Sequence, residues 1–441
     1  MPASTRLLAA AVTAAACLGA QALPAAASTA SANEVSRGVT IPAFYDPPAE
    51  LPAADGALVR SEPLPLALSL PTLHGPLPGK ATRIMYRTTD STGGPAAVTG
   101  AYIEPWARWR GAGARPLVAV APGTMGQGDQ CAASLGLEHP LSLNGQTVSV
   151  GYEDLSIYRL LAKGVAVVVT DYVGLGATDR LHTYVNRLDG AHAVLDAVRA
   201  ARALPGATVT AASRVGLFGY SQGGGAAAAA AELQPDYAPD ITLAGTYAGA
   251  PPADLTETVR GIDGTDLAGA LGWSLNGFLQ SDPELRPIAE AHLNDKGRAA
   301  LKDLSTMCVG DSILAYNSVR SSAWTTDGAT LAEIIQAEPR LQEFLAEQRI
   351  GTLKPAGPVR VATGVSDNLV PHGQARQLAV DWCGRGAQVT YQPVRLPDVG
   401  RALLNHFAPL LTDQGSAISW LTDRLSGEPT GSNCASLPGQ P

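Results

Sequence analysis

A serine flanked by glycines stands out among the residues of this chain that could do chemistry. The pentapeptide Gly219-Tyr220-Ser221-Gln222-Gly223 follows the apolar run VGLF and precedes an alanine-rich stretch. A strand–turn–helix of this kind presents the serine hydroxyl on a tight, exposed elbow, and the glycines permit its close packing. The N–H of Gln222 then lies at a helix N-terminus, where it stabilises negative charge. These features together predict that Ser221 is a nucleophile.

A serine nucleophile needs a histidine base and a carboxylate that orients the base. In the strand–turn–helix architecture these residues follow Ser221 in the order acid, then histidine. His406, in RALLNHFAPL, follows the last predicted strand and is the expected base, on a catalytic loop. Asp367, in VATGVSDNLVP, is the expected acid and is favoured over Asp398, which comes one strand later. His372 is disfavoured because it opens a predicted helix, and the remaining histidines precede the nucleophile or lie in a helical region.

A second donor for the oxyanion is expected in the loop PGTMGQGDQ, which follows the buried-type strand PLVAVAPG. The candidates are the backbone N–H groups of Thr124 and Met125, and the sequence leaves the choice open. Another glycine-bearing segment, DYVGLGATD at 171–179, lacks the third glycine of a dinucleotide site. We expect it to form a loop at the same edge of the sheet as the active site.

Short apolar runs alternate with helical segments along most of the chain. Runs rich in Val, Leu and Ala, without in–out alternation, are typical of strands covered on both faces. The sequence therefore predicts an α/β fold with a mostly parallel central sheet. The expected strands cover 82–90, 96–105, 116–123, 165–172, 214–220, 241–252, 358–367 and 387–396. Besides the helix after the nucleophile, the expected helices cover 156–164, 191–206, 373–386 and 415–427.

The strand pattern stops between residues 253 and 350, where helical segments predominate. We interpret this stretch as a helical lid or cap inserted between two strands of the sheet. The expected organisation is a signal peptide at 1–27, an irregular Pro- and Ala-rich arm at 28–80, the first part of the core at 81–252, the lid at 253–350 and the second part of the core at 351–441.

The N-terminus has the pattern of a secretory signal peptide. A single early charge, Arg6, precedes an apolar stretch and a small-residue cleavage site near Ala27, so we expect a secreted protein. Cys17 offers an alternative, a lipid anchor at the cell surface. Once the signal peptide is removed four cysteines remain, and an even number in an exported chain predicts two disulfides with three pairings open. These cysteines are Cys131, Cys308, Cys383 and Cys434.

The charge and composition exclude several classes of partner. A net charge of −8 and a pI near 5.4 argue against a nucleic-acid partner, because no basic stripe is available to meet phosphates. After the signal peptide no run approaches the roughly 20 apolar residues of a membrane span. No clustered His/Cys spacing suggests a metal site, and we expect no cofactor and a monomeric protein.

Seven sequence blocks resemble a known family. They are GTMGQGDQCAAS, VVTDYVGLGATD, GYSQGG, YAGAPPAD, GVSDNLVP, DWCGRGAQVTY and LNHF. In this order and spacing the chain resembles the secretory lipases, the Candida lipase A type of α/β-hydrolase. The resemblance covers nearly the whole mature chain and implies a triad of Ser221, Asp367 and His406 with a helical lid over an acyl site. The disulfides that it implies are Cys131–Cys308 and Cys383–Cys434.

The predicted lid contains an apolar helix face. Leu267, Leu271, Leu275 and Phe278 share this face at helical spacing, with Trp273 nearby. Such a face either packs onto the body of the protein or lines the acyl site. If it is exposed on opening, it suits a lipid–water interface.

The expected function is that of a serine ester hydrolase, a lipase that cleaves acyl glycerols or related lipid esters through an acyl-enzyme. A carboxylesterase or acyltransferase for small soluble esters is the nearest alternative, followed by a serine peptidase. The triad does not separate these reactions, because acyl transfer is alike whatever the leaving group. A non-catalytic binding protein is the alternative from a different class.

Overall fold

The computed structural model describes residues 34–72, 75–143 and 146–441. The predicted signal peptide, its cleavage site and Cys17 lie outside these residues. Within the described ranges, no helix combines the length and the apolar character needed to cross a membrane.

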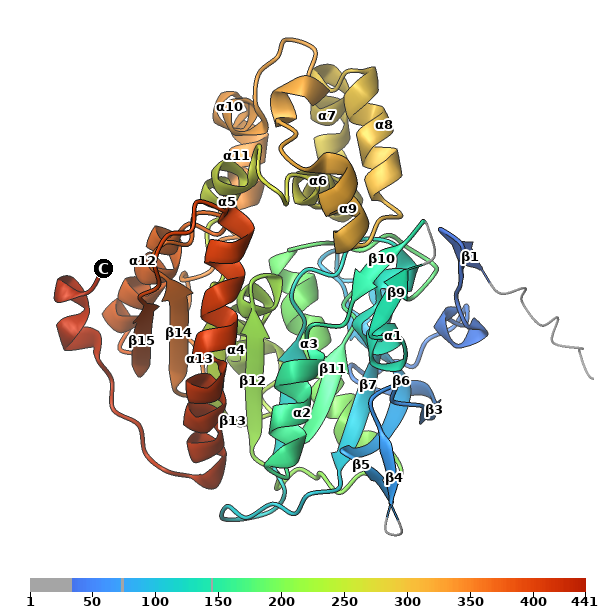
Figure 1. The fold of residues 1–441 in the computed structure, drawn as a ribbon, viewed down its shortest axis with the longest axis vertical. Helices are drawn as coiled ribbons and strands as arrows, with labels where there is room; N and C mark the ends of the chain where they lie inside the picture. Colours follow the sequence, from blue (N-terminus) through green and yellow to red (C-terminus); the bar gives the residue numbers. More distant parts are fainter. Residues whose placement is uncertain (1–33, 73–74, 144–145) are drawn as a thin grey trace, which may run out of the picture. The chain divides into compact units, whose positions relative to one another are not determined.

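A nine-stranded mixed sheet carries the rest of the described structure (Figure 1). Its strand order is β15-β14-β13-β12-β8-β11-β7-β6-β3. Neighbours from β15 to β11 are parallel, and β7, β6 and β3 continue the sheet with antiparallel pairings. The prediction of an α/β fold with a mostly parallel sheet is confirmed. The strands are β3 (Leu58–Leu64), β6 (Gly79–Thr89), β7 (Pro95–Pro105), β8 (Leu117–Ala121), β11 (Ala166–Thr170), β12 (Val215–Tyr220), β13 (Leu243–Gly249), β14 (Val359–Gly364) and β15 (Val389–Val394).

Helices cover both faces of the sheet and create two hydrophobic cores. Strand β8 shows the division, because Leu117 and Ala119 belong to one core whereas Val118 and Val120 belong to the other. This double coverage explains why the central strands read as unbroken apolar runs. The helices of the first core are α3 (Arg187–Ala203), α4 (Gln222–Tyr237) and α12 (His372–Gly384), and those of the second are α2 (Asp154–Ala162) and α13 (Ala402–Ser426).

The chain between β13 and β14 is helical, and none of its described residues joins the central sheet. Figure 1 shows these helices grouped beyond one end of the sheet strands. They have hydrophobic clusters of their own, one around Trp273 and one in which the rings of Phe278 and Phe344 lie 5.0 Å apart. The helices are α5 (Leu255–Ile262), α6 (Gly269–Ser281), α7 (Arg286–His292), α8 (Asp295–Leu304), α9 (Val309–Tyr316), α10 (Leu331–Ala337) and α11 (Pro339–Glu347).

Smaller elements complete the described chain. Three two-stranded hairpins are formed by β1 (Val35–Ser36) with β2 (Val39–Thr40), β4 (Leu70–Thr72) with β5 (Gly75–Leu77), and β9 (Leu141–Leu143) with β10 (Val148–Val150). The short helix α1 covers Ala133–Glu138. The 3₁₀ turns are η1 (Ala43–Tyr45), η2 (Asp129–Cys131), η3 (Pro283–Leu285), η4 (Ser321–Trp324) and η5 (Cys434–Gly439).

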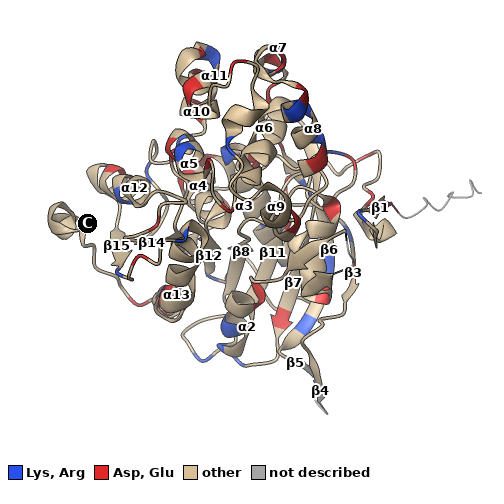
Figure 2. Cartoon of the chain, turned by 45° about the horizontal axis from the view of Figure 1, so that its top comes forward, with Lys and Arg blue, Asp and Glu red and all other residues tan. Residues whose placement is uncertain are grey.

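Charged residues of both signs are spread over the helices, the loops and the outer strands (Figure 2). The central strands β8 and β11, with the sequences LVAVA and AVVVT, contain none. Their burial on both faces leaves no room for an unpaired charge.

The stretch at 28–80, which we expected to be an irregular arm, contains a strand of the central sheet. Strand β3 pairs antiparallel with β6, from Leu58 opposite Tyr86 to Leu64 opposite Ala81. It lies at the edge of the sheet, where Pro63 is tolerated because one side of the strand needs no ladder hydrogen bonds. The prolines that suggested irregular structure are therefore compatible with an edge strand.

The prediction of a catalytic loop around His406 is wrong, because helix α13 begins at Ala402 rather than near residue 415. His406 consequently lies on the buried face of this helix. Pro409 and Gly415 obscured the helix in the sequence, since an interior proline removes one hydrogen bond and costs about 3 kcal/mol. The packing of Leu410, Leu421 and their neighbours into the second core offsets this cost.

Candidate active site

Ser221 lies on a tight turn between β12 and α4, as its motif predicts. Its φ of 57° and ψ of −125° are a rare conformation for a residue with a side chain, and such strain is concentrated at functional sites. The flanking glycines are sterically required. A Cβ on Gly219 would lie 2.0 Å from the carbonyl oxygen of Gly223, and a Cβ on Gly223 would lie 1.9 Å from that of Ala121. The turn is held further by the Ser221 N–H, which donates to the Gly249 carbonyl at 2.9 Å.

Asp367 and His406, which lie 39 residues apart in sequence, form a buried pair. The Nδ1 atom of His406 lies 2.7 Å from Oδ2 of Asp367. The other carboxylate oxygen, Oδ1, accepts hydrogen bonds from the N–H groups of Leu369 and Val370 at 3.1 Å each, so the carboxylate is fixed just after β14. This arrangement orients the imidazole and leaves the proton on Nδ1, with Nε2 as the basic atom.

The Nε2 atom of His406 is buried and has no hydrogen-bond partner among the described residues. Its helix is attached to the nucleophile elbow through the residue before Ser221. The hydroxyl of Tyr220 donates to the His406 carbonyl at 2.6 Å, and the two rings lie 5.3 Å apart. A ring nitrogen without a hydrogen bond is therefore buried on a helix that contacts the residue before Ser221.

The competing residues are engaged elsewhere. Asp398 is exposed and accepts hydrogen bonds from the Asn405 side chain at 2.7 Å and the Gly400 N–H at 2.8 Å, and these bonds lower its pKa. His372 opens α12 as expected, with its ring nitrogens 3.1 Å from the Gly364 carbonyl and 3.1 Å from the Tyr391 hydroxyl. Neither residue takes part in the Asp367–His406 pair.

The loop after β8 passes beside this turn. Its hydrogen bonds show which of its backbone N–H groups already have an acceptor and which do not. The Gly123 N–H donates to Glu153 at 2.7 Å and is thus occupied. The carbonyl of Thr124 accepts from the Tyr152 hydroxyl at 2.9 Å, and its Oγ1 lies 2.7 Å from the Tyr184 hydroxyl. The N–H of Thr124 itself has no partner in the part of the chain that the structure describes. Gln222 is the first residue of α4, so its N–H has no partner within the helix.

Met125, the alternative donor, follows Thr124 and contacts the helical segment between β13 and β14. Its carbonyl accepts from the Val309 N–H at 2.8 Å, and its side chain belongs to the second core. The neighbouring Gly126 forms a β-bridge with Cys308. These contacts attach the chain from Met125 onward to α9, whereas Thr124 remains beside the elbow.

A mainly apolar cavity adjoins Ser221 and extends under helices α5 and α6. Of the predicted acyl contacts, Leu271 and Phe278 line it, as does Leu267. Trp273 and Leu275 do not. Trp273 is completely buried, and its indole N–H donates to the Leu304 carbonyl at 2.9 Å. The remaining lining residues are Tyr184, Val185, Gln222, Pro252, Leu255, Thr258, Val259, Ile262, Ser274 and Val370.

The helical face predicted from the sequence is therefore divided. Helix α6 begins at Gly269, after Leu267, and Ser274 rather than Leu275 faces the cavity. Leu275 packs against the cluster around Trp273. Both roles that we considered for this face, packing and cavity lining, are thus found on different residues of the same helix.

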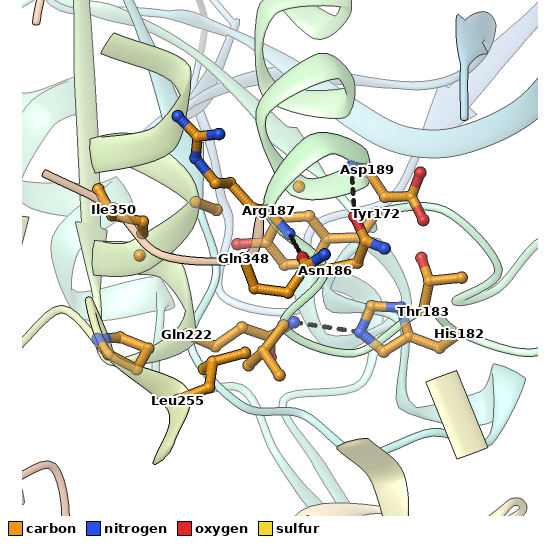
Figure 3. Close-up of a pocket in the computed structure, with 15 residues that line it drawn as sticks. Tyr172, His182, Thr183, Asn186, Arg187, Asp189, Gln222, Leu255, Gln348 and Ile350 are labelled. Carbon is orange, nitrogen blue, oxygen red and sulfur yellow. Dashed lines mark hydrogen bonds between the residues drawn. The ribbon is translucent and has the colours of Figure 1, made fainter. Parts of the chain in front are cut away.

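A second, more polar cavity also has Gln222 in its wall (Figure 3). Its wall includes Tyr172, His182 and Asn186, from the segment between β11 and α3. Figure 3 shows the Gln222 side chain directed at the His182 ring, with 3.1 Å between the two Nε2 atoms. Motif analysis missed this segment because its residues match no catalytic pattern. The only indication in the sequence was the prediction that the neighbouring motif DYVGLGATD forms a loop at the active-site edge of the sheet.

Burial changes the acidity of several groups near the site. It raises the pKa of Glu153 to about 7, although the Gly123 N–H opposes the shift. It lowers the pKa of His182 to about 4, so this ring is neutral near pH 7. Among the described residues, no group of three or more His, Cys, Asp or Glu side chains is placed to hold a metal ion.

Both disulfides implied by the family resemblance are present in the structure. Cys131–Cys308 joins the chain after the oxyanion loop to the start of α9. Cys383–Cys434 joins the end of α12 to the C-terminal 3₁₀ turn, remote from Ser221.

Comparisons with known proteins bear on the family and the fold of this chain. The model of the secretory lipase family matches residues 137–433. A protein of Mycobacterium tuberculosis named a probable inactive lipase is 30% identical over 388 residues, which cover 88% of this chain and 82% of that protein. Lipase 10 of Candida albicans is 27% identical over 416 residues, covering 90% and 84% of the two chains. The solved structure of Candida antarctica lipase A has the same fold, with a TM-score of 0.73 at 20% identity over 89% of this chain and 87% of that one.

Proposed function

The chain belongs to the secretory lipase family, and from this premise we propose that it is a secreted serine hydrolase that cleaves acyl glycerols or related lipid esters. The observation that carries the proposal is the buried Asp367–His406 pair, whose Nε2 atom has no partner among the described residues and whose helix is hydrogen-bonded to Tyr220, the residue before Ser221. An unsatisfied buried nitrogen is costly, and its retention is expected where it accepts a proton during a reaction.

In the proposed reaction, the Ser221 hydroxyl attacks the ester carbonyl carbon while His406 Nε2 takes its proton. Asp367 stabilises the imidazolium that forms. The tetrahedral intermediate collapses as His406 returns the proton to the leaving alcohol oxygen. Water, activated by the same nitrogen, then attacks the acyl-enzyme, and the carboxylic acid is released.

The negative charge of both tetrahedral intermediates requires two donors. We assign these to the backbone N–H groups of Gln222 and Thr124, since the Gly123 N–H is occupied by Glu153. Donors of this kind act in a dry, preorganised site, and each contributes on the order of 10²–10³ in rate.

The apolar cavity under α5 and α6 supports a lipid ester as the substrate. Leu255, Ile262, Leu267, Leu271 and Phe278 line it next to Ser221. An acyl chain gains roughly 0.8 kcal/mol for each CH₂ group removed from water. We therefore assign the acyl chain to this cavity and the alcohol to the side of His406, which must protonate it.

The proposal is tested by the hydrolysis of nitrophenyl esters from acetyl to palmitoyl and of emulsified triglyceride, with Ser221→Ala as the matched variant. We expect turnover of long-chain esters and of the emulsion, and its loss in Ser221→Ala. Turnover confined to short esters would change the substrate class to small soluble esters. Equal inactivity of both proteins would place the chain with its relative named an inactive lipase and would refute the catalytic proposal.

A further inference from the structure

His182 is a buried histidine that the proposed reaction does not use. It lies in the segment between β11 and α3 and is 2% exposed. Its Nδ1 atom is 2.9 Å from the Val173 carbonyl oxygen, which can only accept a hydrogen bond. The proton of the neutral ring must therefore lie on Nδ1, and Nε2 presents a lone pair.

This lone pair faces the side chain of Gln222. The amide nitrogen of Gln222 lies 3.1 Å from Nε2 of His182 and donates to it (Figure 3). Burial lowers the pKa of His182 to about 4, so the ring stays neutral above that pH. Gln222 thus has both ends constrained: its backbone begins α4 directly after the nucleophile, and its side chain is anchored to a different segment of the chain.

The same ring packs between two tyrosines that hold the other oxyanion loop. Tyr172 stacks on His182 with ring centres 5.9 Å apart, and its hydroxyl donates to the Pro122 carbonyl at 2.7 Å. Tyr184 meets His182 edge to face at 5.9 Å, and its hydroxyl lies 2.7 Å from Oγ1 of Thr124. One imidazole therefore contacts the groups that position both N–H donors.

The backbone of His182 also reaches the helical segment. Its carbonyl accepts a hydrogen bond from the Gln127 side chain at 2.9 Å, and the same amide group donates to the Trp273 carbonyl at 3.1 Å. The residue is held from the helical segment on one side and from the sheet on the other. Its ring has little freedom to move away from Gln222.

We propose that His182 is a positioning residue for the oxyanion hole, which aligns the Gln222 peptide through the side-chain amide and supports the 122–124 loop through the stacked ring of Tyr172 and the edge-to-face ring of Tyr184. The inference rests on the proposed function, because it assigns the residue a part in stabilising the tetrahedral intermediate. It predicts that loss of the ring nitrogen lowers turnover and leaves substrate binding intact, since the donors act mainly on the developing oxyanion.

The test compares His182→Phe, which keeps a ring but removes the acceptor, with Gln222→Leu, which removes the side-chain donor but keeps the backbone N–H. We expect each variant to lower kcat about tenfold with KM within about twofold, because small displacements of an oxyanion donor are costly. The double variant should be no slower than either single one. His182→Gln, which restores an acceptor, should recover most of the rate.

His192→Phe is the matched control. This histidine is partly buried, stacks on Tyr237 at 3.6 Å and bonds to the Thr89 carbonyl, and neither of these partners belongs to the site. We expect its kcat to match that of the unmodified chain. A boronic acid with an alkyl chain, which becomes a tetrahedral anion on Ser221, should bind His182→Phe about tenfold more weakly and His192→Phe normally.

Three outcomes would overturn the inference. The first is a double variant whose loss of kcat is the product of the two single losses. The others are a change confined to KM, and a loss of kcat in His192→Phe equal to that in His182→Phe. If His182→Phe does not fold, the Gln222→Leu and His182→Gln variants still decide, since both leave the packing nearly unchanged. Failure of the proposed function has a different signature, which is the absence of Ser221-dependent hydrolysis in the unmodified chain.

Discussion

The site draws on two regions of the molecule that differ in how they are built. The end of the sheet supplies Ser221, Asp367 and His406, each directly before, in or after a regular element. The helical segment between β13 and β14 supplies the apolar cavity and holds the loop beyond Thr124 through hydrogen bonds and a disulfide. We propose that the first region carries the reactive groups and that the second determines which substrates reach them.

This difference has a physical origin. A parallel sheet brings the carboxyl ends of its strands to one edge, so residues after different strands meet without any special long-range contact. The helical segment has no such scaffold, and its position depends on individual contacts such as Gln127 with the Trp273 carbonyl. Changes in the first region should therefore abolish the chemistry, whereas changes in the second should alter rate and selectivity.

The largest effect is expected for Asp367→Asn. The amide cannot hold His406 in the required tautomer, so kcat should fall about 10⁴-fold with KM little changed. Steady-state hydrolysis of a nitrophenyl ester measures it. Asp398→Asn is the control and should retain full activity, since Asp398 bonds only to Asn405 and Gly400 among the described residues. Equal losses in both variants would contradict the assignment of the acid.

Removing each disulfide in turn compares the two regions, because the two removals should lower the free energy of unfolding by similar amounts. The disulfides enclose 177 and 51 residues, and a chain-entropy model gives upper values of about 5 and about 4 kcal/mol for their contributions to the free energy of unfolding. Replacing Cys131 and Cys308 by serine should lower Tm and also kcat, by about tenfold, because the oxyanion loop loses its anchor. Replacing Cys383 and Cys434 should lower Tm alone. The comparison would fail if both pairs changed kcat equally.

Cavity substitutions should change selectivity without changing chemistry. Leu271→Trp fills space beside Ser221 and should lower kcat/KM for palmitoyl esters about tenfold or more, while acetyl esters react normally. Leu275→Trp, on the same helix but outside the cavity, is the matched control. A loss for short and long esters alike would show that Leu271 supports the catalytic turn rather than the acyl site.

The smallest effect concerns stability and pH. Burial raises the pKa of Glu153 from 4.5 to about 7, so between these values the folded chain binds more protons than the unfolded chain. Stability must then fall as pH rises from about 4.5 to about 7, by up to about 3 kcal/mol from this group. Glu153→Gln, which still accepts from Gly123, should flatten this part of the curve and change kcat little.

Denaturant unfolding at several pH values measures the slope. It should be reduced and not abolished in Glu153→Gln, because burial also raises the pKa of Asp154 to about 7. A slope unchanged by the substitution would mean that Glu153 is ionised throughout. The Gly123 N–H would then be bonded to a charged acceptor at all pH values tested.

Sequence reasoning worked where local pattern and sheet topology coincide. The strand patterns predicted every strand from β6 to β15 that belongs to the central sheet. Two of the three residues chosen from their order in the chain, Asp367 and His406, form a hydrogen-bonded pair. Sequence reasoning failed where packing overrides local preference. Strand β3 lies in a Pro- and Ala-rich stretch that suggested irregular structure, but it pairs with β6. Helix α13 continues through Pro409 because its buried face packs into the second core.

The site residues that motif reasoning missed have in common that they act through partners distant in sequence. Glu153 bonds to Gly123, His182 to Gln222, and Tyr184 to Thr124. Buried polar residues of these types occur in any core, and only their partners make them part of the site. The sequence alone does not show which residues these partners are.

The sequence by itself determined the fold class, the glycine-flanked turn at Ser221 and the order of the proposed reactive residues, because glycine sterics and strand periodicity act over a few residues. Tertiary structure decided which N–H group of the oxyanion loop remains free, which side chains of α6 face the cavity, and what the imidazole of His182 contacts. The hydrogen bonds that decide the first and the last of these, Gly123 to Glu153 and Gln222 to His182, join residues 30 and 40 positions apart in the chain. The cavity likewise combines residues from segments distant in sequence. Such contacts are set by the packing of the whole chain and leave no local pattern to read.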